Sequence, residues 1–389
     1  MTLAAASQTA PSQPPEPLPP LDHVGRIAAV RNSLAVHEVD VVVVTRLVNV
    51  RYLSGFSGSH GVLVIAAQAP PTLVTDGRNR DQAAAELQQA GVEVALRVES
   101  VDFNAALTEV VHAAGSERAD TSQGLRIGLE AEEVSWAEQR RYAERFPAAQ
   151  LVALTNVVEG LRARKDPGEI ARMELAAHIA DQALADTVAL LHDEPTEAGF
   201  ALALEIAMRR LGADGPSFET IVASGPNGAL PHARPGPRRI QRGDLVVLDF
   251  GALVAGYHSD MTRTVCVGPA SSDQRRHFDV VHRAQADARD AVRAGVATKH
   301  IDAVARGIIE SAGWAEQFSH GTGHGIGLEV HEAPLLSRTT PGLLEVDFVV
   351  TVEPGVYKPG QGGVRIEDTV VVSETGCRSL TRFPKELEV

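Results

Sequence analysis

Two strand-forming runs flank a two-residue turn in the stretch LVVLDFGALVAGYHSDMTRTVCV (Leu245–Val267). The turn is Ala255–Gly256, and the pattern around it is typical of a β-hairpin. Asp249 and Asp260 are nearly equidistant from the turn, so the hairpin would bring two carboxylates together. Like charges opposed across a strand pair destabilise it, and a divalent cation between them would remove that cost. Taken alone, a strand-ending Asp and a turn-capping Asp explain the pattern equally well.

A second stretch, DFVVTVEPGVYKPGQGGVRIEDTVVV (Asp347–Val372), repeats the same order. An apolar strand ends in a carboxylate, a glycine-rich loop follows, and a returning strand carries another carboxylate. Glu353 and Glu367 are placed symmetrically about the loop centre near Gly360. This repetition disfavours the alternative that each Glu is only a solvated strand-end residue. It indicates two related halves joined face to face.

The third stretch, SHGTGHGIGLEVHE (Ser319–Glu332), holds three histidines among four alternating glycines. His320 and His324 have the spacing of helical zinc sites, but the glycines disfavour a helix. We therefore expect a loop packed against a site, with at least one functional histidine among these two and His331. His232 precedes the first carboxylate strand in LPHARPGP, and its sequence context alone does not distinguish it from an ordinary loop histidine.

Five side chains of these stretches can bind metal, namely Asp249, Asp260, His324, Glu353 and Glu367. Four carboxylates and one imidazole form an oxygen-rich set that suits two divalent cations better than a structural zinc ion. Two such cations can activate a bound water at neutral pH. The sequence therefore predicts a hydrolase.

The composition excludes several classes of partner. A net charge of -14 argues against nucleic acid and against anionic membranes, because both need clustered Lys and Arg. No apolar run is long enough to predict a membrane span. The chain has two cysteines, Cys266 and Cys377, which implies no disulfide framework and favours a cytoplasmic location.

The length of 389 residues predicts two domains. Residues 1–20 are proline-rich, lack the features of a signal peptide, and are expected to form a disordered tail. Residues 21–155 alternate apolar strands, such as VDVVVV (Val39–Val44), with helical patterns, which predicts an α/β domain. No phosphate-binding loop follows these strands, so this domain is interpreted as architectural or substrate-shaping.

Residues 156–389 have a different pattern of helices and strands. The charged segment RARKDPGE (Arg162–Glu169) marks the boundary region, and long helical patterns follow at 167–192 and 196–211. Short strands punctuated by Gly and Pro come next, interrupted by helical patterns at 272–294 and 301–313. This organisation predicts an α+β domain that carries the chemistry.

These stretches, together with FETIVASGPNGALPHA (Phe218–Ala233), resemble the metallopeptidase family of methionine aminopeptidases, prolidases and aminopeptidase P. The resemblance covers about residues 156–389, and the five family metal positions match in order. It implies a pita-bread catalytic fold behind a creatinase/prolidase-like α/β domain. It also implies two metal ions, usually manganese and less often cobalt or zinc, and a homodimer.

The same resemblance assigns roles to the metal-binding set. Asp249 and Asp260 would chelate one metal, with Asp260 bridging, and His324 would bind the other. Glu353 and Glu367 would be terminal and bridging ligands. A water or hydroxide bridging the metals would attack the peptide carbonyl, and Glu353 would take the proton of that water.

Four further residues have roles by the same resemblance. His232 and His331 match histidines that hydrogen-bond the substrate and stabilise the tetrahedral oxyanion. His320 matches a position near the prolyl pocket. Arg365 lies two residues from Glu367, hence on the same strand face, where it would brace a ligand carboxylate or meet a substrate carboxylate.

The resemblance narrows the substrate to a peptide with proline at the second position. The α/β domain excludes methionine aminopeptidases, and the intact ligand set argues against creatinase. NVRYLSGFSGSHG (Asn49–Gly61) and TDGRNRDQA (Thr75–Ala83) resemble small bacterial aminopeptidase P more than archaeal-type prolidase. We therefore expect an Xaa-Pro aminopeptidase, with an Xaa-Pro dipeptidase as the alternative. A non-catalytic pita-bread binding protein is disfavoured, because such a protein gains nothing from four converging carboxylates.

Overall fold

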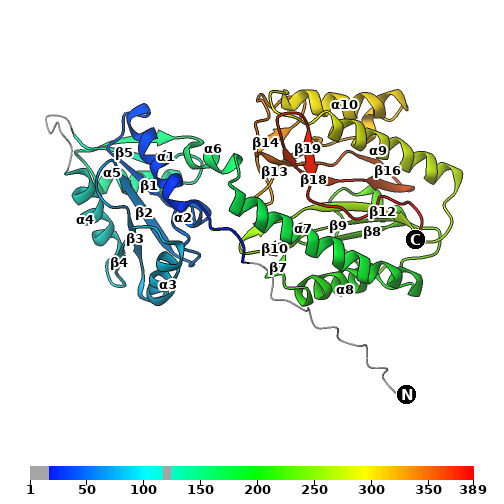
Figure 1. Cartoon of the computed structure of the whole chain (residues 1–389), viewed down its shortest axis with the longest axis horizontal. Coiled ribbons are helices and arrows are strands. Elements are labelled where there is room, and N and C mark those ends of the chain that lie inside the picture. Colours follow the sequence, from blue (N-terminus) through cyan, green and yellow to red (C-terminus); the bar gives the residue numbers. More distant parts are fainter. Residues whose placement is uncertain (1–16, 117–123) are drawn as a thin grey trace, which may run out of the picture.

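The computed structural model describes residues 17–116 and 124–389, so most of the predicted proline-rich tail, residues 1–16, lies outside the described chain. Two α/β-rich parts lie side by side and are joined through helices α6 (Val157–Ala163) and α7 (Pro167–Thr187), as Figure 1 shows. Within the described residues, no helix is both long and apolar enough to cross a membrane.

The first part is built on one six-stranded mixed sheet with the order β4-β3-β2-β1-β5-β6. Strand β1 (Val41–Val44) is fully buried at its centre, as the β-branched run predicts. It pairs antiparallel with β2 and parallel with β5. The remaining strand bounds are β2 (Gly61–Ala66), β3 (Thr72–Thr75), β4 (Ala95–Val98), β5 (Arg126–Glu130) and β6 (Gln150–Leu154).

Helices cover both faces of this sheet because successive side chains of a strand point to opposite faces. Val42 and Val44 pack in one core cluster with residues of α1, α2 and α3. Val41 and Val43 pack in another cluster with residues of α4 and α5. The helix bounds are α1 (His23–Val36), α2 (Leu47–Ser54), α3 (Arg80–Ala90), α4 (Phe103–Gly115) and α5 (Trp136–Arg145). The sequence analysis did not predict α2, α5, β4 or β6.

The second part has four layers. A three-stranded sheet, β12-β9-β8, packs against α7 and α8, and a five-stranded sheet, β14-β13-β15-β18-β19, packs against α9 and α10. In Figure 1 the two helix pairs lie on opposite outer sides and the strands lie between them. This arrangement agrees with the predicted pair of halves joined face to face. The helix bounds are α8 (Glu197–Arg210), α9 (Ser272–Asp290) and α10 (Thr298–Ser311).

The strands of the second part carry the stretches singled out in the sequence. Helix α7 begins at Pro167 behind Asp166, which makes a capping box with Glu169. The strand bounds are β7 (Gly215–Pro216), β8 (Ile221–Ser224), β9 (Leu245–Phe250), β10 (Ala252–Val254), β11 (Tyr257–His258), β12 (Met261–Cys266), β13 (Gly323–Gly325), β14 (Glu332–Leu336), β15 (Val349–Val352), β16 (Gly355–Lys358), β17 (Gly362–Arg365), β18 (Asp368–Val372) and β19 (Cys377–Ser379). Short 3-10 turns lie at Gly77–Asn79, Val188–Asp193, Gly225–Ala229 and Ala315–Gln317.

Candidate active site

The first predicted hairpin is present. Ala255 and Gly256 both have positive φ, 49° and 84°, as the two-residue turn of a twisted hairpin requires. The register, however, sets Asp249 of β9 opposite Thr262 of β12. Asp260 therefore lies two residues from the opposed position, on the same face of the pair. The direct opposition of Asp249 and Asp260 was wrong, but the two carboxylates share a face.

The second hairpin has the predicted symmetry. The pairs on either side of the carboxylates, Val352 with Asp368 and Gly355 with Arg365, are both centred on Gly360. This register sets Glu353 opposite Glu367. The prediction made for this hairpin from the sequence is confirmed.

His324 reaches the carboxylates from β13, a short strand rather than the expected loop. The glycines around it allow close strand packing, because a Cβ at Gly323 would lie 2.0 Å from the Thr351 carbonyl oxygen. The imidazole Nε2 lies 3.2 Å from Glu353 Oε1 and 3.8 Å from Asp260 Oδ2. Nδ1 lies 3.0 Å from the Gly325 carbonyl oxygen, which accepts a hydrogen bond only from a protonated Nδ1. In the neutral form with that proton, the Nε2 lone pair would be available to a cation bound between the imidazole and the carboxylates.

The buried carboxylates repel one another. Burial raises the pKa of Asp260 well above its usual value, and Glu367 and Asp249 raise it further. Burial, then Glu353 and Asp249, raise the pKa of Glu367 in the same way. Burial also raises the pKa of Asp249, although Arg365 opposes that shift. A bound cation would hold these groups ionised.

The geometry of the donors fits divalent cations. One ligand atom each from Asp260, His324 and Glu367 lie within 4.8 Å of one another. Asp249 Oδ1 and Glu367 Oε1 are buried and have no hydrogen-bond partner among the described residues. Buried oxygens without donors are costly unless a cation takes the place of the donor. The set of oxygens and one imidazole nitrogen is the kind that binds hard or borderline divalent ions.

Arg365 braces one carboxylate of the set. Its guanidinium, 4% exposed, pairs with Asp249 Oδ2 and donates to Tyr357 Oη at 2.8 Å. Tyr357 Oη in turn lies 2.9 Å from His320 Nε2. Because the donors of Arg365 are engaged by protein groups, the contacts favour the bracing role over contact with a substrate carboxylate. A chain of contacts thus links His320 to Asp249.

One cavity of about 610 Å³ collects these side chains. His331 lines it with its ring centroid 4.4 Å from that of His324, and burial followed by His324 lowers the pKa of His331. His232 is exposed to the cavity from the opposite loop. Phe218, Ile221 and Val330 supply apolar wall. The polar lining includes His232, Asp249, Asp260, His320, His324, His331, Glu353, Tyr357, Arg365 and Glu367.

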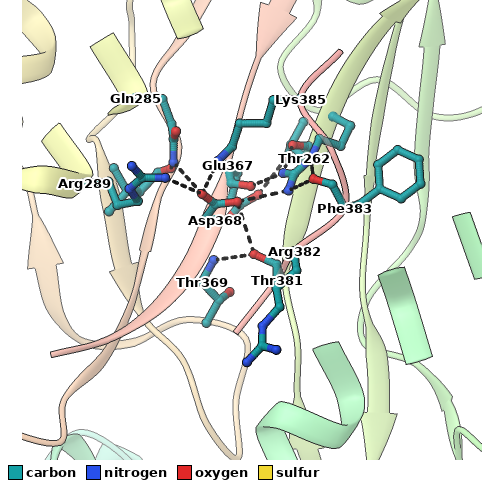
Figure 2. A network of polar contacts seen from close by, with 12 residues as sticks. Thr262, Gln285, Arg289, Glu367, Asp368, Thr369, Thr381, Arg382, Phe383 and Lys385 are labelled. Carbon is teal, nitrogen blue, oxygen red and sulfur yellow. Dashed lines mark hydrogen bonds and ion pairs between the residues drawn. The ribbon is translucent and has the colours of Figure 1, made fainter. Parts of the chain in front are cut away.

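A buried polar network holds the start of β18, directly after Glu367 (Figure 2). The next residue, Asp368, accepts hydrogen bonds from Arg263 at 3.0 Å and Gln285 at 3.1 Å, and pairs with Lys385. Burial alone would raise the pKa of Asp368, but Arg263 and Lys385 hold it below its usual value. Arg263 also donates to the Glu367 carbonyl oxygen. These contacts fix the backbone at Glu367.

Sequence reasoning missed three contributors to the site. Tyr357 links Arg365 to His320, Thr262 donates to Glu367 Oε2 at 2.8 Å, and Asp368 anchors the strand. Tyr357 and Asp368 both fall inside the second quoted stretch. Their positions follow from hairpin register and cross-chain packing, which local patterning does not reveal.

Two family models match the chain. Residues 171–374 match metallopeptidase family M24, and residues 26–164 match the Creatinase/Prolidase N-terminal domain. The chain is similar to an Xaa-Pro dipeptidase from Pyrococcus furiosus, with 40% identity over 261 residues that cover 67% of this chain and 75% of the relative.

Two solved structures share the whole architecture. One is an Xaa-Pro dipeptidase from Bacillus anthracis, with a TM-score of 0.87, 34% identity, and coverage of 95% of this chain and 100% of that chain. The other is an X-Pro aminopeptidase from Thermotoga maritima MSB8, with a TM-score of 0.82, 36% identity, and coverage of 92% and 100%. The predicted fold, an α/β domain followed by an α+β pita-bread domain, is confirmed.

Proposed function

The chain belongs to metallopeptidase family M24, and from that premise we propose that it is a dimetal Xaa-Pro dipeptidase. The observation that carries the proposal is the convergence of two carboxylate-bearing hairpins and His324 on one cavity. Four clustered carboxylates, two of which have a buried oxygen without a partner among the described residues, are of use to a hydrolase and costly to a binding module.

The dipeptidase replaces the aminopeptidase as the preferred interpretation. Two of the three relatives described above are Xaa-Pro dipeptidases, one of them from Pyrococcus furiosus. The sequence-based preference for aminopeptidase P rested on short stretches of the first domain. An Xaa-Pro aminopeptidase stays as the second candidate, because the Thermotoga maritima structure is 36% identical over nearly the whole chain.

Asp249, Asp260, His324, Glu353 and Glu367 would hold two divalent ions, which when bound lower the pKa of a water and polarise the substrate carbonyl. We infer manganese as the physiological ion. Glu353 would take the proton of the attacking water, and the position of its Oε1 beside His324 at the cavity wall supports this role. Arg365 pairs with Asp249, which orients this carboxylate and favours its ionised form.

Three histidines would contact the substrate. His232 and His331 line the cavity and can donate to the oxygen that becomes negative in the transition state. His320, held by Tyr357, would border the pocket for the proline ring, beside the apolar Phe218 and Ile221. A homodimer, a cytoplasmic location, and domain limits at 21–155 and 156–389 belong to the same proposal.

Substrate length tests the proposal. Purified enzyme loaded with Mn²⁺ is given Ala-Pro, Ala-Pro-Ala and a longer Ala-Pro peptide, and release of alanine is followed for each. A dipeptidase cleaves Ala-Pro with the highest kcat/KM. Faster cleavage of the longer peptides supports the aminopeptidase, and absence of turnover on all of them refutes both. Ala-Ala serves as the control for proline selectivity.

A further inference from the structure

Arg234 lies in the cavity wall, where its one ion pair among the described residues is an exposed contact. The residue before it, Ala233, is buried and packs with Ala223 and Val247. This anchor holds the backbone of the loop, and the side chains on either side of it, His232 and Arg234, are exposed and line the cavity. Arg234 therefore shares a wall with a histidine assigned to the substrate.

The guanidinium of Arg234 is free to bind a ligand. Its side chain is 82% exposed, and its one ion pair within residues 17–116 and 124–389 is a 3.4 Å contact from Nε to Glu219, itself 65% exposed. A pair of this kind contributes little, because water screens both charges. Arg365, the other arginine of the lining, is buried and donates to protein groups instead.

The charges of the cavity favour an anionic group once metal is bound. Five carboxylates line it, the four ligand carboxylates and Glu219, against two arginines. With these carboxylates ionised, two bound divalent cations would change the net charge of the cavity from negative to slightly positive. A substrate carboxylate entering there needs a donor that is not already used, and a guanidinium binds a carboxylate through two parallel hydrogen bonds.

We propose that Arg234 binds the free C-terminal carboxylate of the substrate and thereby selects dipeptides. This inference rests on the proposed Xaa-Pro dipeptidase. In an Xaa-Pro dipeptide the proline carries the carboxylate, whereas each added residue moves that charge about 3.5 Å along the chain and leaves a neutral amide in its place. Arg234 would thus distinguish the two substrates by charge at one position.

The test compares an acid with its amide. Ala-Pro and Ala-Pro-amide are given to the Mn²⁺-loaded wild type and to the variants Arg234→Ala and Arg234→Lys. We expect Arg234→Ala to lower kcat/KM for the acid by about 10- to 100-fold, the worth of a charge-assisted contact, and to leave the amide nearly unchanged. Arg234→Lys keeps the positive charge but loses the planar guanidinium. It should therefore retain part of the preference for the acid over the amide that Arg234→Ala loses.

Two controls separate direct binding from other effects. Arg141→Ala removes an exposed arginine of the first domain that lies 3.9 Å from Glu138. This variant should leave kcat/KM unchanged for both substrates. The double variant Arg234→Ala, Glu219→Gln removes the negative charge that Arg234 partly balances. If the acid preference returns in the double variant, Arg234 acted only by neutralising Glu219 and the proposal is overturned.

The two proposals fail in different ways. Equal losses on acid and amide, or no loss on either, overturn the assignment of Arg234 while wild-type turnover of Ala-Pro still supports the dipeptidase. A wild type that cleaves Ala-Pro-Ala but not Ala-Pro overturns the dipeptidase and, with it, the role of Arg234. A fall in kcat/KM for the acid but not for the amide, seen in Arg234→Ala and in the double variant, supports both the dipeptidase and the role of Arg234.

Discussion

Glu332→Gln is expected to destabilise the protein strongly, because Glu332 is the buried anion of a network that joins the two domains. Its Oε1 accepts from Arg162 at 2.5 Å and its Oε2 accepts from Lys165 at 3.2 Å. All three side chains are at most 5% exposed. Arg162 also donates to Asn49 of the first domain at 2.8 Å.

The magnitude follows from what the substitution leaves behind. The introduced amide would be uncharged, so Lys165 would lose its carboxylate partner. Arg162 would keep its hydrogen bond to Asn49 and its ion pair with the partly exposed Glu329. Breaking a buried ion pair by neutralising one partner costs about 3–5 kcal/mol in the free energy of unfolding. For a domain of this size, the melting temperature should fall by roughly 6–20 °C.

Calorimetric melting at pH 7 checks this expectation against Glu109→Gln. Glu109 pairs with Arg97 at 3.3 Å, but both side chains are about half exposed or more, so its loss should cost under about 1 kcal/mol. Equal shifts for the two variants would refute the reasoning. A fall confined to Glu332→Gln would support it.

The pH dependence gives a second check. Burial alone would raise the pKa of Glu332, but Lys165 and Arg162 hold it below its ordinary value of 4.5. A lowered folded-state pKa stabilises the fold above the unfolded pKa, and this stabilisation is lost as the pH falls through the folded pKa. The gap in melting temperature between wild type and Glu332→Gln should therefore narrow below about pH 4.5. A gap that widens on acidification would contradict the assignment.

Three further predictions concern the site. Asp260→Asn should lose bound metal and lower kcat by more than about 100-fold, and full metal content by elemental analysis together with normal turnover would contradict it. Tyr357→Phe removes the hydroxyl between Arg365 and His320, so kcat/KM for Ala-Pro should fall about 10-fold while metal content is kept. Mn²⁺ at 100 times its Kd should stabilise the wild type by about 2.7 kcal/mol in melting experiments, and the shift should be reversed by a chelator and absent in Asp260→Asn.

Local patterns in the sequence determined much of the framework. The run Val41–Val44 is buried on both faces as its composition requires, and the glycines around His324 exclude a helix there. Symmetry about Gly360 placed Glu353 opposite Glu367, and a matching pattern located the turn at Ala255–Gly256. Such features depend on residues close together in the chain, so their physical causes are visible in the sequence.

Long-range packing was decided only by the tertiary structure. The register of the first hairpin was not, because counting outward from the two-residue turn at Ala255–Gly256 already sets Asp249 opposite Thr262. The contact of Arg162 with Glu332 joins positions 170 residues apart, and its formation depends on how two domains pack. Long-range packing also determines that Arg365 is buried in an ion pair with Asp249 and that Arg234 stays exposed. The sequence supplied five candidate metal ligands in order, and the folded chain determined which charged side chains around them remain exposed to the cavity.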